Sequence, residues 1–165
     1  GAQLLICGSG REKEHLTALI KELGISDRAH LLGFRNDIYE LLKCADAFVF
    51  PSKQEGLPVA LMEAMAAGLP CIASRIRGNV DLLPDSRYLF EASDESTLCQ
   101  LMQDAVNGVQ VDQECAQNKK ALEQFDVKNV SECISGRCIV LTRNPFVPEL
   151  TSNSLTKSCS CLCKT

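Results

Sequence analysis

The sequence predicts an α/β fold in which a parallel β-sheet is flanked by helices. Short apolar runs alternate along the chain with segments that have the 3.6-residue periodicity of helices, and such alternation is typical of parallel sheets. The run Leu69–Ala73 is apolar and bounded by Gly68 and Ser74, as expected for a strand that is buried on both faces. The 165 residues are enough for one domain with its own core.

The first predicted unit is a strand, a glycine turn and a helix. Gln3–Cys7 is an apolar run that enters Gly8-Ser9-Gly10. A helix is expected within residues 11–23, where leucine and isoleucine keep the spacing of one helix face, and Gly24 ends it. Gly8 and Gly10 also raise the alternative of a dinucleotide fingerprint, but Lys13 stands where its third glycine belongs. A strand-to-helix turn that needs room for the backbone is the preferred interpretation.

Two more strands are predicted at Ala29–Gly33 and Ala47–Phe50. The first leads into Phe34-Arg35-Asn36-Asp37, and either Asn36 or Asp37 can cap a helix at Ile38–Cys44. Parallel strands end at the same edge of a sheet, so three loops, at Gly8, Arg35 and Glu55, are expected together there. Open α/β sheets bind ligands at this edge, and the arrangement is that of a Rossmann-like half-site.

The loop and helix that follow the third strand carry the predicted chemistry. Pro58 is tolerated in the first turn of a helix, residues 60–67 are strong helix formers, and Gly68 is placed to end the helix. Glu55 lies on the loop, and Glu63 lies eight residues later in the second turn, leaning back toward the helix start.

The start of this helix is expected to bind phosphate. The N–H groups of Leu57, Val59 and Ala60 have no partner within the helix, and with the helix dipole they favour an anion. A diphosphate on these amides, with a carboxylate on either side to accept sugar hydroxyls, describes a nucleotide sugar. The alternative from spacing alone is a solvated helix face with two exposed glutamates.

The remaining elements are predicted from capping and periodicity. Val80–Leu83 is a short turn of helix, and Tyr88–Phe90 is an edge strand. Asp94 precedes a helix whose apolar residues hold helical spacing. A second, weaker helix is expected over about Asp112–Phe125.

The last part of the chain has a different character. From Asn129 no periodicity is sustained, and five of the ten cysteines fall in this tail. Its closing C-x-C-x-C pattern lacks the paired C-x-x-C or histidine that zinc sites use, so no metal site is expected. We expect residues 129–165 to be a non-homologous, disordered, Cys-rich tail.

Charge and hydrophobicity exclude some function classes. The net charge is −4 and the pI is near 5.2, which argues against nucleic-acid binding because that normally uses a basic face. No apolar run approaches the roughly 18 residues of a membrane helix, and no signal peptide opens the chain. A cytoplasmic location is the default expectation.

The segment E-G-L-P-V-A-L-M-E-A-M-A-A-G-L-P-C-I-A resembles the E-x7-E segment of the retaining glycosyltransferases of the GT-B fold, family 4. The resemblance covers roughly residues 1–125 and implies part of the C-terminal, donor-binding half of such an enzyme, truncated at its N-terminus. The N-terminal acceptor domain is missing, as are the opening strand and helix of the donor domain, where the family keeps an Arg and a Lys beside the diphosphate. We therefore divide the chain into a partial nucleotide-sugar-binding Rossmann-like domain, 1–128, and the tail, 129–165.

The resemblance also implies roles for individual residues. It assigns the donor sugar hydroxyls to Glu55 as the catalytic residue, the ribose hydroxyls to Glu63, and the distal phosphate to the amides near Leu57 and Val59. The remaining donor-binding candidates belong to the glycine turn, the segment that meets the base and the loop around the helix start: Gly8, Gly10, Phe34, Arg35, Gly56 and Pro58.

The expected function is that of a glycosyltransferase donor domain. It would transfer a sugar with retention from a nucleotide diphosphate sugar, a UDP-sugar by preference, to a glycan or lipid-linked acceptor in polysaccharide biosynthesis. No metal or other cofactor is expected, since these enzymes usually need none. Peripheral membrane association of the full-length enzyme is compatible with the resemblance but is not encoded in these residues. The alternative is an inactive fragment that binds nucleotide weakly or not at all.

Overall fold

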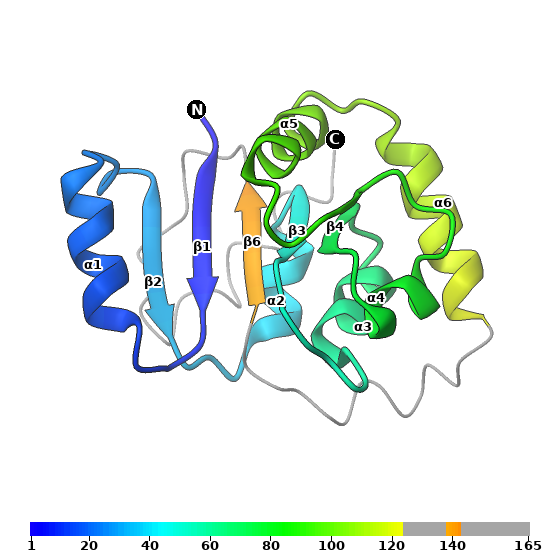
Figure 1. Cartoon of the computed structure of the whole chain (residues 1–165), viewed down its shortest axis with the longest axis horizontal. Coiled ribbons are helices and arrows are strands. Elements are labelled where there is room, and N and C mark those ends of the chain that lie inside the picture. Colours follow the sequence, from blue (N-terminus) through cyan, green and yellow to red (C-terminus); the bar gives the residue numbers. More distant parts are fainter. Residues whose placement is uncertain (124–137, 143–165) are drawn as a thin grey trace.

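The computed structural model describes residues 1–123 and 138–142. These residues form one sheet in the order β2-β1-β6-β3-β4-β5 with helices packed on it (Figure 1). The strands are β1 (Gln3–Cys7), β2 (Ala29–Gly33), β3 (Ala47–Phe50), β4 (Cys71–Ser74), β5 (Leu89–Phe90) and β6 (Cys138–Thr142). The helices are α1 (Lys13–Glu22), α2 (Ile38–Lys43), α3 (Val59–Ala66), α4 (Arg77–Leu82), α5 (Glu95–Val106) and α6 (Val111–Leu122).

Strands β1 to β5 form the parallel part of the sheet. Strand β1 pairs in parallel with β2, and β3 pairs in parallel with β4, which pairs in parallel with β5. The predicted parallel α/β fold is therefore confirmed, and β5 lies at the predicted edge. Among the described residues, no helix combines the length and the apolar character needed to cross a membrane.

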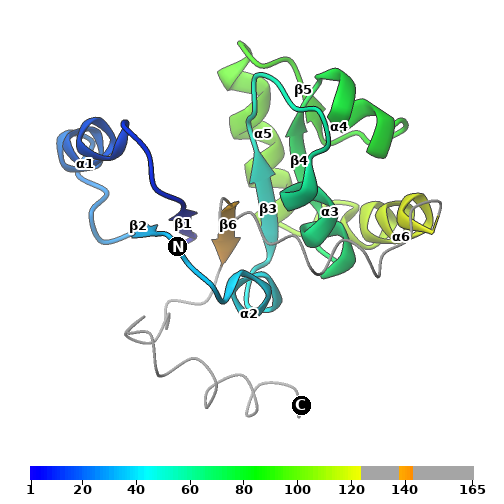
Figure 2. The same cartoon turned by 90° about the horizontal axis from the view of Figure 1, so that it is seen from below.

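The core has two layers, one on each face of the sheet. Phe48 of β3 packs in one cluster with the buried faces of α2 and α3. Its neighbour Val49 packs in the other cluster with α5, because successive side chains of a strand point to opposite faces. Viewed from below, α1 lies beside β2, and α2 lies on the other side of the sheet, near β6 and β3 (Figure 2).

Strand β6 comes from the tail and lies in the middle of the sheet. It runs antiparallel to both β1 and β3, and Val140 pairs with Leu5 on one side and with Phe48 on the other (Figure 1). The sheet has the strand order 3-2-1-4-5-6 of doubly wound folds when β6 is counted as strand 1 and β1 to β5 as strands 2 to 6. The central strand, β6, runs in the opposite direction to its two neighbours. Residues 138–142 thus form a strand within the tail that was expected to be mostly disordered. The other tail residues and the domain boundary near residue 128 lie outside the described residues.

The helix that carries Glu63 matches its prediction. It begins after Pro58 and its C-cap is Ala67. Gly68 follows with φ +81°, a left-handed conformation in which glycine avoids the strain of a side chain. Asp94 accepts a hydrogen bond from Thr97 N at 2.9 Å, as a helix cap should.

Two helix starts differ from expectation. Helix α4 begins at Arg77 instead of Val80. At α2, Asp37 occupies the N-cap position but makes no side-chain capping bond. Its carboxylate instead accepts a hydrogen bond from Arg35 Nε at 2.7 Å, because a charged donor two residues away competes successfully with the backbone amides.

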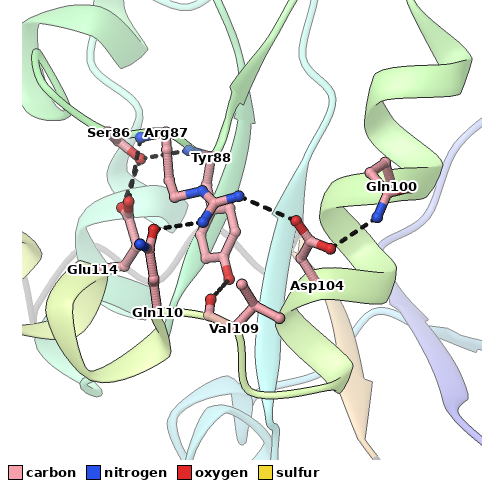
Figure 3. A network of polar contacts seen from close by, with 8 residues as sticks. All are labelled: Ser86, Arg87, Tyr88, Gln100, Asp104, Val109, Gln110 and Glu114. Carbon is pink, nitrogen blue, oxygen red and sulfur yellow. Dashed lines mark hydrogen bonds and ion pairs between the residues drawn. The ribbon is translucent and has the colours of Figure 1, made fainter.

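A polar network fastens the β5 edge of the sheet to α5 and α6 (Figure 3). The buried carboxylate of Glu114 accepts hydrogen bonds from Ser86 Oγ at 2.8 Å and from Arg87 N at 3.2 Å. Arg87 also pairs with Asp104 at 3.2 Å, and the Tyr88 hydroxyl donates to Val109 O at 2.7 Å. These bonds satisfy the polar groups of Ser86, Arg87 and Tyr88, which lie just before the short edge strand β5.

The central position of β6 predicts that Val140→Asp strongly destabilises the protein. Val140 is completely buried, so the variant places a carboxylate in the core, and we expect a loss of more than about 3 kcal/mol in the free energy of unfolding. Urea denaturation measures this loss. The control Val109→Asp makes the same change at a side chain that is 39% exposed. Equal stability of the two variants would show that β6 is not a core strand.

The edge network predicts a cost for Glu114→Ala. The variant leaves the Ser86 hydroxyl and the Arg87 N–H without their acceptor, and we expect a loss of about 1–3 kcal/mol in the free energy of unfolding. Thermal denaturation followed by circular dichroism measures it. Glu22→Ala, at an exposed position in the last turn of α1, is the matched control and should change stability by less than about 0.5 kcal/mol. A loss no larger than the control's would contradict the role given to Glu114.

Candidate functional site

A cavity of about 740 Å³ opens at the carboxyl ends of β1 and β3. This volume lies in the range of small-molecule sites. Because β6 is antiparallel to both strands, β1 and β3 run in the same direction and end at the same edge. The wall includes Gly8, Gly10, Arg11, Lys13, Gly33, Ser52, Glu55, Leu57, Val59, Ala60 and Ile139. The predicted edge site therefore exists as a cavity, and β6 contributes Ile139 to it.

The glycine turn after β1 brings backbone close to the cavity. Gly8 has φ +133°, and its N–H donates to Gly33 O at 2.7 Å, which joins the loops that follow β1 and β2. The helix α1 starts directly after this turn, with Lys13. Gly8 and Gly10 both line the cavity, and their part in donor binding stays a prediction.

Two cations at the start of α1 were not recognised from the sequence. Arg11 and Lys13 line the cavity, and neither takes part in an ion pair with the residues that the structure describes. In the sequence, Lys13 is visible as the residue that interrupts the glycine pattern after the first strand, and it argues there only against a dinucleotide site. The sequence alone does not show that Arg11 and Lys13 line the same cavity as Glu55.

Glu55 lies in the cavity wall on the loop between β3 and α3. Ser52 Oγ donates a hydrogen bond to Glu55 Oε1 at 2.5 Å. The serine hydroxyl holds the carboxylate in one orientation. Glu55 is thus a positioned acceptor that a bound hydroxyl group can reach.

The start of α3 forms the opposite part of the wall. Leu57, Val59 and Ala60 all line the cavity. The Val59 N–H is not available, because it donates to Leu57 O at 2.9 Å, and the expectation of a free amide there is corrected. The Leu57 and Ala60 N–H groups make no hydrogen bond to described residues. Two of the three expected anion donors are therefore present.

Glu63 is buried within α3, with a side chain that is 9% exposed. It lies three and four residues after Ala60 and Val59, so it shares their face of the helix, but it does not itself line the cavity. Its Oε1 has no hydrogen-bond partner among the described residues. Burial raises the pKa of Glu63 to about 7, because removal from water disfavours the ionised form.

The other predicted site residues lie beside the cavity and do not line it. Arg35 is held by Asp37, and this hydrogen bond raises the pKa of Arg35 and lowers the pKa of Asp37. Phe34, next to the lining residue Gly33, is 63% exposed. Gly56 and Pro58 connect Glu55 to the helix without forming the wall.

No group of three or more potential metal ligands occurs within residues 1–123 and 138–142. The C-x-C-x-C pattern of the tail lies outside the described residues. The expectation that no metal is used stays a prediction.

Solved structures with the same fold are GT-B glycosyltransferases. HepE from Anabaena, in complex with UDP-glucose, superposes with a TM-score of 0.64 at 23% identity, over 76% of this chain and 37% of HepE. WaaG, a glycosyltransferase involved in lipopolysaccharide biosynthesis, superposes with a TM-score of 0.63 at 22% identity, over 76% of this chain and 35% of WaaG. The predicted Rossmann-like fold of a GT-B domain is confirmed.

Sequence relatives are also glycosyltransferases. The chain is 45% identical over 75 residues to UDP-Gal:alpha-D-GlcNAc-diphosphoundecaprenol alpha-1,3-galactosyltransferase of Escherichia coli. The aligned region covers 44% of this chain and 19% of that enzyme. It is 38% identical over 95 residues to N-acetyl-alpha-D-glucosaminyl L-malate synthase of Bacillus anthracis. The aligned region covers 56% of this chain and 25% of that synthase. The matched region thus spans about a fifth to a quarter of these relatives.

The family described as glycosyl transferases group 1 matches residues 1–122. This range contains all the parallel strands and every described helix. Since the match takes in most of the chain and agrees with the fold, the protein belongs to the glycosyl transferases group 1 family.

Proposed function

We propose that this domain binds a nucleoside diphosphate sugar, a UDP-sugar by preference, in the cavity between β1 and β3. The observation that carries the proposal is Glu63. Its buried Oε1 atom has no hydrogen-bond partner among the described residues. One turn earlier, at the start of α3, the Leu57 and Ala60 N–H groups make no hydrogen bond to described residues either. Buried polar atoms are normally hydrogen-bonded, so an unpartnered acceptor and unpartnered donors in the first two turns of one helix favour a ligand with both hydroxyl and anionic groups.

The diphosphate is assigned to the two helix starts that meet at the cavity. The free amides of α3 supply donors and the positive end of a helix dipole. Arg11 and Lys13, from the other side of the cavity, supply full positive charges. Together they would neutralise most of the charge of a diphosphate, with Glu12 in the same wall offsetting part of their positive charge.

The carboxylates are assigned to the two sugars of the donor. Glu63 would accept hydrogen bonds from ribose hydroxyls, and Glu55, positioned by Ser52, would accept them from the transferred sugar. Phe34 is proposed to lie near the base, because it is an exposed aromatic next to the lining residue Gly33. Arg35 supports this loop through its pairing with Asp37.

The same groups explain how transfer would be promoted. The leaving group is a nucleoside diphosphate, so amides, dipole and cations that stabilise its developing charge lower the barrier most. Retention is proposed from the resemblance of the E-x7-E segment, with the departing phosphate assisting the acceptor instead of a protein nucleophile. The Escherichia coli relative is named for UDP-Gal as donor, and HepE was crystallised with UDP-glucose, which supports a UDP-sugar here.

Transfer to an acceptor is proposed for a protein that also contains an acceptor-binding domain. The matched region spans 19% and 25% of two relatives, and the described residues form a single sheet with one cavity at its edge. For the chain as given, we therefore propose donor binding without rapid transfer.

Glu63→Ala tests the site. We expect it to weaken binding of UDP by roughly 10- to 100-fold, because it removes a charge-assisted acceptor of the ribose hydroxyls. Isothermal titration calorimetry of UDP and of UDP-glucose, UDP-galactose and UDP-N-acetylglucosamine measures the change. The control Glu22→Ala removes an exposed glutamate of α1 and should bind as wild type does. If wild type and Glu63→Ala bind UDP equally, the site assignment fails.

The raised pKa of Glu63, about 7, predicts a pH-dependent affinity. Hydroxyl donors favour the ionised carboxylate, so binding releases a proton, and UDP affinity should rise from pH 6 to pH 8 and level off above. Ionisation of UDP itself adds to the slope near pH 6. Glu63→Gln keeps the contribution of UDP ionisation and loses that of Glu63 ionisation. The affinity of this variant for UDP should therefore change less with pH than that of wild type. Identical pH profiles would contradict binding through the ionised carboxylate.

A further inference from the structure

A chain of hydrogen bonds links α4 to Glu55 across the end of the sheet. Asn79 Nδ2 donates to Ser74 O at 2.9 Å, Ser74 Oγ donates to Ser52 O, and Ser52 Oγ donates to Glu55 Oε1 at 2.5 Å. Asn79 comes from α4, Ser74 ends β4, and Ser52 lies in the loop after β3. Each of the first two bonds therefore holds the backbone of the residue whose hydroxyl makes the next bond.

A steric contact joins the same two places independently. A Cβ atom at Gly78, in the first turn of α4, would lie 3.1 Å from Glu55 O and 3.3 Å from Gly56 O. The backbone of the Glu55 loop thus rests directly on α4. The close approach of this loop favours glycine at position 78, and the backbone φ does not, since it is not in the left-handed region.

Burial makes this chain rigid. Asn79 and Ser74 are 0% exposed, and hydrogen bonds away from water are stronger and compete with no solvent. The Asn79 Oδ1 atom has no partner among the described residues. Asn79 therefore makes its contacts with Ser74 through the Nδ2 donor, to Ser74 O at 2.9 Å and to Ser74 Oγ at 3.3 Å.

We propose that Asn79, Ser74 and Ser52 are positioning residues that orient Glu55 toward the sugar part of the donor. The inference rests on the proposed function, in which Glu55 contacts that sugar. The Ser52 hydroxyl occupies one carboxylate oxygen and leaves the other to accept a sugar hydroxyl. Helix α4, which contributes no residue to the cavity wall, thereby acts on the specificity of the site for the sugar over the bare nucleotide.

The hydrogen bonds that lead from Asn79 through Ser74 and Ser52 to Glu55 are called the relay below. The test compares the affinities for UDP and for UDP-sugars in variants of this relay. In Ser52→Ala and Asn79→Leu, the affinity for UDP should stay within about twofold of wild type. The affinity for the UDP-sugar that wild type prefers, among UDP-glucose, UDP-galactose and UDP-N-acetylglucosamine, should fall roughly tenfold. Ser52→Thr keeps the hydroxyl and should retain most of the affinity. Ser93→Ala, at an exposed position before α5, is the serine control. An equal loss for UDP and UDP-sugar would indicate a merely structural role and overturn the proposal.

A second measurement does not depend on nucleotide binding. In ligand-free protein labelled with ¹³C, the Glu55 carboxyl resonance should shift in Ser52→Ala and in Asn79→Leu, and should remain close to wild type in Ser52→Thr and Ser93→Ala. An unchanged Glu55 resonance in both relay variants overturns the proposal. If wild type binds no UDP, the proposed function fails, and the Glu55 resonance alone then decides whether the relay exists.

Discussion

The site depends on one constraint, which is that β1 and β3 end at the same edge of the sheet. The two strands do not pair with each other; β6 lies between them and pairs with both. Its two backbone ladders together join one half of the sheet to the other, and Val140 and Leu141 fill the cores on opposite faces. The cavity is the space above this junction, so its walls come from both halves and its floor includes Ile139 of the tail strand.

Charge within the cavity is distributed according to what each part of a nucleotide sugar requires. Arg11 and Lys13 stand at one helix start, and unpaired amides stand at the other. One carboxylate, that of Glu12, lies beside these cations in the cavity wall, whereas Glu55 lies on the loop and Glu63 on the buried face of α3. Glu63 is the most informative of these groups, because an isolated buried carboxyl is unfavourable and its Oε1 atom finds no hydrogen-bond partner in the part of the chain that the structure describes.

Glu55 differs from Glu63 because another side chain of the protein holds its carboxylate. It is held by Ser52, and the loop that carries it packs against Gly78. Helix α4 is short, yet through these contacts it influences a residue that belongs to another segment of the chain. A positioned acceptor loses less conformational freedom on binding than a mobile one, which is why a supporting layer matters in a site that recognises hydroxyl groups.

The sequence by itself determined the local features of this protein. The parallel α/β elements, the helix between Pro58 and Gly68 and the loop that carries Glu55 follow from periodicity, turn residues and helix ends, which act over a few residues. Only the tertiary structure decided the rest: the insertion of β6, the facing of Arg11 and Lys13 into the cavity, and the relay from Asn79 to Glu55. These depend on contacts between residues far apart in the sequence, and no local pattern specifies which distant groups will meet.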